Sequence, residues 1–116
     1  MRVFKNKIFS RFARHESISD ASLLEAVEMA EKGLIDADLG GCVIKQRIAR
    51  PGQGKSGGFR SIILFRSGDR AFFVYGFAKN DRDNITPVEK EAFKELAAEM
   101  LNYSEDVLNM TIKAGG

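Results

Sequence analysis

Positively charged side chains are concentrated in the middle third of the chain. Residues 42–82 hold nine Lys and Arg against two Asp, a net charge of +7, whereas residues 1–41 carry −1 and residues 83–116 carry −4. A cationic segment of this kind is typical of a surface that binds a polyanion, most often a nucleic acid. The alternative interpretation is that these charges belong to solvated strand faces without a partner.

The side chains that remain for catalysis are mainly Lys, Arg and Tyr. The chain has one histidine, His15, and one cysteine, Cys42, which excludes a two-histidine acid–base pair and an internal disulfide and leaves no transition-metal cluster. No metal or cofactor is expected. Cationic side chains can still promote RNA cleavage, in which the 2′-hydroxyl attacks the adjacent phosphorus while cations stabilise the charge on the phosphorane oxygens. In such a site a lysine can act as a weak base and a tyrosine can orient an RNA base.

A Gly-Lys-Ser sequence at residues 54–56 matches the end of the phosphate-binding loop of many ATPases and GTPases. The full motif needs a glycine at position 49, which is alanine, and a helix after the serine, where the glycines at 57 and 58 lead into a strand. The nucleotide-binding interpretation is therefore rejected. Backbone amides of this glycine-rich segment and the Lys55 ammonium remain candidates for contacts with a phosphodiester backbone.

Helices are predicted on both sides of the cationic segment. Apolar residues at helical spacing predict helices over residues 6–14 and 20–32, and Phe4 either begins the first helix or belongs to a short strand. Thr86 to Glu89 forms a capping box with proline at the first helical position, and an apolar stripe then continues to Leu101. Carboxylates lie mainly in these helices and are interpreted as solvating them.

Three β-rich runs lie between the second and third helices, at residues 42–49, 59–66 and 71–78. Residues 67–70 form a hairpin turn by composition, and residues 51–58 are expected to form a long flexible loop. Cys42, at the start of the first run, is expected to be a small buried side chain. The fold prediction is a single α+β domain over residues 1–116, with a three-stranded antiparallel meander, two N-terminal helices and one C-terminal helix. A further N-terminal strand stays open, and residues 103–116 are expected to form a flexible tail.

The chain shows no sign of a membrane or secretory segment. No apolar run approaches the roughly 20 residues of a membrane helix, and the N-terminus does not lead into a signal-peptide core. A cytoplasmic protein that does not contact a membrane is expected.

Three segments carry a family likeness: GGCVIKQRIA at residues 40–49, GKSGGFRSII at residues 54–63 and YGFAKN at residues 75–80. In this order and spacing they resemble the RelE/HigB-like toxins of bacterial toxin–antitoxin pairs, within the RelE/ParE superfamily. The resemblance implies an endoribonuclease, an mRNA interferase that cuts messages by 2′-hydroxyl attack without a metal, usually in the ribosomal A site. It also implies a paired antitoxin, commonly a helix-turn-helix protein, through which alone the toxin would reach operator DNA.

The resemblance also assigns site residues, with catalytic cations on the first central strand and at the start of the second. Because side chains alternate along a strand, Lys45 and Arg47 are predicted to share one face of the sheet, and Arg60 to join them from the neighbouring strand. The predicted catalytic residues are Lys45, Arg47, Arg60 and Lys79, and the predicted RNA contacts are Lys55, Arg50, Tyr75, Phe77 and Asn80.

Two other functions stay open at this point. Asn80 stands where relatives with a Lys-Arg pair carry arginine, and residues 86–101 contain no tyrosine to match the one that some relatives place near the final helix. These departures favour a non-catalytic RNA or ribosome binder, including a degenerate toxin. The ParE-like branch, which poisons DNA gyrase through protein contact, is the other alternative, and the cationic residues above argue against it.

Overall fold

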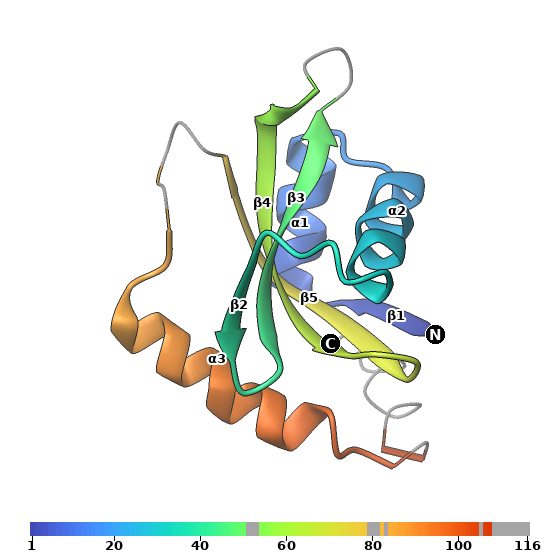
Figure 1. The fold of residues 1–116 in the computed structure, drawn as a ribbon, viewed down its shortest axis with the longest axis vertical. Coiled ribbons are helices and arrows are strands. Elements are labelled where there is room, and N and C mark those ends of the chain that lie inside the picture. Colours follow the sequence, from blue (N-terminus) through green and yellow to red (C-terminus); the bar gives the residue numbers. More distant parts are fainter. Residues whose placement is uncertain (51–53, 79–81, 83, 105, 108–116) are drawn as a thin grey trace.

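The computed structural model describes residues 1–50, 54–78, 82, 84–104, 106 and 107, with only the backbone described at residues 50 and 54–57 (Figure 1). It is an α+β fold with a five-stranded sheet in the order β1-β5-β4-β3-β2. The strands are β1 (Arg2–Lys5), β2 (Ala37–Gly40), β3 (Val43–Arg50), β4 (Gly54–Arg66) and β5 (Arg70–Ala78), and the helices are α1 (Lys7–His15), α2 (Asp20–Glu31) and α3 (Pro87–Met100).

The central meander is confirmed, because β3, β4 and β5 pair antiparallel in consecutive order. The open question about Phe4 is also decided, since β1 pairs with β5 in parallel and extends the sheet by one strand. The strand β2 was not predicted. It has only four residues, Ala-Asp-Leu-Gly, and contains none of the β-branched or aromatic residues that mark a strand.

The predicted loop over residues 51–58 is wrong in its second half. The strand β4 already begins at Gly54, which pairs with Arg50 across a register irregularity in β3. Glycine has no side chain that signals a strand, so only the backbone ladder reveals this extension. Residues 51–53 lie outside the described residues. The Gly-Lys-Ser sequence therefore lies in a strand and no helix follows it.

Each helix begins at a side chain that caps it. The Asn6 side chain accepts a hydrogen bond from the Phe9 N–H at 2.8 Å, and Ser19 does the same for Ser22. Thr86 and Glu89 complete the predicted capping box of α3. These local contacts satisfy backbone N–H groups that the helix itself leaves unpaired.

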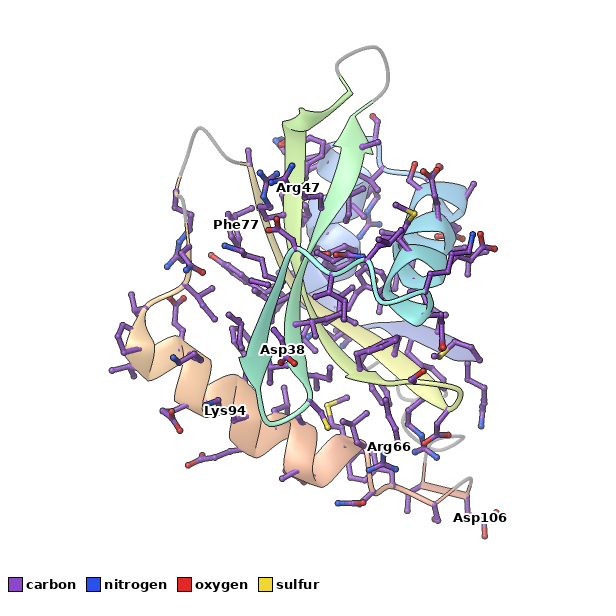
Figure 2. The ribbon with its side chains drawn as sticks, in the orientation of Figure 1. Asp38, Arg47, Arg66, Phe77, Lys94 and Asp106 are labelled. Carbon is purple, nitrogen blue, oxygen red and sulfur yellow. The ribbon has the colours of Figure 1, made fainter. Side chains whose placement is uncertain are left out.

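Helices cover both faces of the sheet (Figure 1). The helices α1 and α2 pack on one face over a core that includes Phe9, Ile63 and Phe73. The helix α3 packs on the other face over a second core that includes Ile62 and Leu64, and it lies across the end of the sheet near the β2–β3 turn. The opposite end of this second face carries Arg47 and Phe77 (Figure 2).

Two smaller expectations, on Cys42 and on the C-terminal tail, are corrected by the structure. Cys42 is exposed, with a φ of 65° in the turn between β2 and β3, and is not buried. The predicted tail begins with an anchored residue, because Arg70 Nη1 donates a hydrogen bond to the Tyr103 carbonyl at 2.7 Å. Residues 108–116 lie outside the described residues.

Among the described residues, no helix combines the length and the apolar character needed to cross a membrane.

Candidate active site

Three cationic side chains share the sheet face on which α3 packs. Lys45 and Arg47 are two residues apart on β3, and Arg47 lies directly opposite Arg60 on β4. Residues at this spacing, and residues directly opposite each other on antiparallel strands, point to the same side of a sheet. The prediction that these three side chains share one face is confirmed, whereas their catalytic role stays a prediction.

A carboxylate that the sequence analysis did not single out lies between these cations. Asp36 Oδ1 accepts a hydrogen bond from Arg47 Nε at 2.9 Å, and Asp36 Oδ2 lies 3.6 Å from Arg60 Nε and 4.0 Å from Lys45 Nζ. We call these four residues the Asp36 cluster. Three positive charges share one negative charge, so the cluster as a whole remains cationic.

The Asp36 cluster runs from a buried interior to an exposed rim. The side chain of Arg60 is 7% exposed and that of Asp36 is 14% exposed, whereas that of Arg47 is 46% exposed. Arg60 Nη1 is buried and has no hydrogen-bond partner among the described residues. A buried donor without a partner is costly, and an oxygen of a bound anion would remove that cost. The cluster therefore has the charge and the free donor of an anion-binding site.

A glutamine on the other side of β3 holds Asp36 in place. The buried side chain of Gln46 accepts a hydrogen bond from the Asp36 N–H at 3.0 Å, and its Nε2 donates to the carbonyls of Ala26 at 3.0 Å and Leu34 at 2.9 Å. Asp36 is thus fixed between α2 and β3 just before β2 begins. No local pattern marks this position, and only the pairing of Ala37 with Lys45 across β2 and β3 brings it to the cations.

The two aromatic residues predicted to contact RNA do not have open ring faces. Phe77 is buried in the second core and packs against Tyr75, with their ring centroids 6.0 Å apart. It is a core residue rather than a surface for base stacking, because it is only 3% exposed and the Arg82 guanidinium lies over its ring. Tyr75 is partly buried between Phe77 and Phe93, and its hydroxyl accepts a hydrogen bond from Arg82 at 3.1 Å.

Arg82 makes a second charged cluster at the edge of this core. Its guanidinium donates to both carboxylate oxygens of Glu89, at 2.6 and 3.2 Å, and to the Asn84 carbonyl at 2.9 Å. It also lies over the rings of Tyr75 and Phe77, 5.7 and 5.8 Å from their centroids. These hydrogen bonds, together with one from the Thr86 N–H, lower the pKa of Glu89 to about 2. We call Arg82 with Tyr75, Asn84 and Glu89 the Arg82 clamp.

The remaining predicted site residues are not placed. The side chains of Arg50 and Lys55, and both Lys79 and Asn80, lie outside the described residues. Their roles in catalysis or RNA binding stay predictions.

Comparison with protein families identifies the family to which this chain belongs. The family model described as the RelE toxin of the RelE / RelB toxin–antitoxin system matches residues 1–116. The chain belongs to the RelE toxin family. The resemblance carried by the three sequence segments is therefore confirmed, and family membership implies a cognate antitoxin as partner of this RelE-family toxin. A search of curated proteins gave no match.

Proposed function

We propose that this RelE-family toxin is a ribosome-dependent endoribonuclease that cleaves messenger RNA by attack of a 2′-hydroxyl on the adjacent phosphorus. The observation that carries the proposal is Arg60, a buried cation whose Nη1 has no hydrogen-bond partner among the described residues. It lies next to Lys45 and Arg47 on one sheet face, and such a group of cations is suited to stabilising the charge that develops on a phosphodiester during cleavage.

The reaction needs little more than positioning and positive charge. The bond from the 2′-oxygen to phosphorus forms as the hydroxyl proton passes to solvent water, and the bond to the 5′-oxygen breaks as that oxygen takes up a proton. The products are a 2′,3′-cyclic phosphate and a free 5′-hydroxyl. Arg47 and Arg60 are suited to stabilise the phosphorane oxygens, because a guanidinium keeps its charge and presents several donors in a fixed plane. In this proposal the Lys45 ammonium donates to a phosphate oxygen or to the departing 5′-oxygen. Lys79 stays a predicted member of the set.

The composition of the Asp36 cluster supports the proposed dependence on the ribosome. Asp36 is its one carboxylate, and that group is already engaged by the three cations. A site of this composition gains most of its rate from RNA that is held with the 2′-oxygen, the phosphorus and the 5′-oxygen in line. We propose that the ribosome supplies this alignment and that the antitoxin prevents it by blocking entry of the toxin.

A translation reaction with primer extension tests this proposal. Purified toxin is added to ribosomes translating a defined message, and cleavage is mapped at nucleotide resolution. Cuts in codon register are expected, and a message with 2′-O-methyl groups at the cut positions should resist cleavage because the nucleophile is blocked. The same reaction with free message measures the contribution of the ribosome.

Other outcomes of this experiment decide between the alternatives. Binding of toxin to ribosomes without any cut would identify a non-catalytic binder or a degenerate toxin. DNA breaks that require gyrase, together with intact message, would identify a ParE-like activity. Cleavage of the 2′-O-methyl message at the same positions would contradict the proposed chemistry.

A further inference from the structure

We infer that Asp36 is a positioning residue for RNA cleavage: it holds Arg47 and Arg60 by their Nε atoms and leaves their Nη atoms directed at the scissile phosphate. This inference rests on the proposed function and deepens it. Asp36 itself would touch neither the RNA nor the reacting atoms.

The contacts of the two guanidinium groups support this role. Asp36 lies 2.9 Å from Arg47 Nε and 3.6 Å from Arg60 Nε, and neither contact uses an Nη atom. A guanidinium has five N–H donors, of which Nε carries one. The carboxylate therefore contacts both side chains through Nε and leaves their Nη donors outside this contact. The buried Arg60 Nη1, without a partner among the described residues, is one of those donors.

The charge of the cluster favours the transition state over the bound substrate. One carboxylate against three cations leaves two positive charges in excess. An RNA phosphodiester carries one negative charge, whereas its phosphorane carries two. Interactions accelerate a reaction only when they are stronger in the transition state than in the ground state. Without Asp36 the excess charge would bind intact RNA more tightly but would leave the two arginines without a fixed orientation.

The backbone around Asp36 gives this carboxylate a defined place. Its N–H is bound to Gln46, which in turn is bound to the carbonyls of Ala26 and Leu34. The following residue, Ala37, pairs with Lys45 on β3. The carboxylate is therefore held by the same strand that presents Lys45 and Arg47, which is how a positioning residue transmits order to its partners.

The test compares Asp36→Asn with Asp38→Asn. Asp38 is an exposed carboxylate two residues away whose Oδ1 accepts a hydrogen bond from the Gly40 N–H, so its variant removes one nearby negative charge without touching the cations. Single-turnover cleavage is measured on ribosomes saturated with toxin, across a range of pH. Binding is measured separately with a 2′-O-methyl RNA oligonucleotide, which cannot be cleaved at its 2′-positions.

For Asp36→Asn, cleavage should be about 10- to 100-fold slower, the range expected when catalytic groups are misplaced by about 1 Å. Binding of the 2′-O-methyl RNA should be as tight as wild type or tighter, and the shape of the pH–rate profile should not change. Asp38→Asn should match wild type in cleavage. If Asp36→Asn does not fold, Asp36→Glu keeps the charge and decides the question, with slower cleavage and unchanged binding expected.

Three results would overturn the inference. Cleavage at the wild-type rate or faster in Asp36→Asn, or at the wild-type rate in Asp36→Glu, would show that the carboxylate orients nothing or opposes the substrate. Loss of binding in proportion to loss of cleavage would indicate a structural role only. Disappearance of an acidic limb of the pH–rate profile that wild type shows would make Asp36 a general base.

A readout independent of cleavage separates this inference from the proposed function. The Nε–H protons of Arg47 and Arg60 should exchange slowly with water in the wild-type toxin, and faster in Asp36→Asn, when followed by nuclear magnetic resonance. If wild type cleaves no message, the proposed function fails while these protons still report on orientation. Equal exchange in the two proteins would exclude the orienting role even in an active enzyme.

Discussion

Arg60 and Arg82 flank the same sheet face but differ in how their charges are satisfied. The side chain of Arg60 is 7% exposed, has one carboxylate nearby and retains a buried Nη1 without a partner among the described residues. The side chain of Arg82 is 28% exposed, yet each of its nitrogens has a hydrogen-bond partner. The more buried arginine is therefore the less satisfied one.

This difference is the one expected between an anion-binding site and a structural contact. Buried polar groups in proteins are almost always hydrogen-bonded, so an unsatisfied buried donor indicates a missing partner. The Arg82 clamp needs no further partner, and it ties the end of β5 to the first turn of α3. The Asp36 cluster retains a buried donor without a partner among the described residues, which an oxygen of a bound anion would satisfy. Charge alone, as read from the sequence, does not distinguish the two.

The largest expected effect is that of Arg60→Ala on cleavage. Loss of one preorganised donor to the transition state should slow single-turnover cleavage by about a hundredfold or more. The thermal midpoint should stay near that of wild type, because Asp36 keeps Lys45 and Arg47 as partners. Arg66→Ala is the matched control, since Arg66 lies at the far end of β4 and bonds Asp69 and Asn102. A hundredfold loss of cleavage in Arg66→Ala as well would show that the effect is not specific to the Asp36 cluster.

A smaller effect is expected for Arg82→Ala, which should change stability and leave cleavage nearly unchanged. It removes the hydrogen bonds to Tyr75, Asn84 and Glu89, so the midpoint of unfolding in urea should fall. Cleavage per folded molecule should stay within about twofold of wild type, because the clamp lies outside the Asp36 cluster. Slow cleavage by a variant with unchanged stability would place Arg82 in the RNA site together with the Asp36 cluster.

The smallest expected effect concerns acid. The pKa of Glu89 is lowered to about 2 from an ordinary value of 4.5, first by hydrogen bonds from Arg82 and then by the Thr86 N–H. Because the folded-state pKa is the lower one, ionised Glu89 contributes stability above pH 4.5 that is lost as the pH falls toward 2. Glu89→Gln should remove this dependence, so the difference in urea midpoint between the variant and wild type should shrink over that range. A constant difference would show that the clamp is not the source.

The helices and the central strands could be predicted because their signals are local. The caps at Ser19 and Thr86 and the hairpin turn before Arg70 are each contained within a few residues. The shared face of Lys45, Arg47 and Arg60 follows from strand alternation plus one pairing. For the same reason β2 and the first residues of β4 were missed, since alanine and glycine give no strand pattern and only the ladder defines them.

The failures at the site have a different cause, which is distance along the chain. Asp36 meets Arg60 only after two strand pairings are made, and nothing near Asp36 in the sequence announces this. Phe77 alternates with residues on β5 in a way that fits either a core or an exposed aromatic stripe, and only its packing against Tyr75 and Arg82 identifies it as a core residue. Arg82 looks like any other member of the cationic segment until Glu89 is placed beside it.

The parallel pairing of β1 with β5 sets the order in which the fold can be completed during synthesis. Arg2 pairs with Arg70, and Phe9 of α1 packs against Phe73 with ring centroids 4.9 Å apart. At about 5–20 residues per second, the ribosome needs roughly 3 to 14 seconds to make the chain between them. The residues of β1 are thus made long before β5, their partner strand, is available. A chain that stops before β5 leaves β1 and α1 without the strand that holds them, so the N-terminal part of the sheet cannot form.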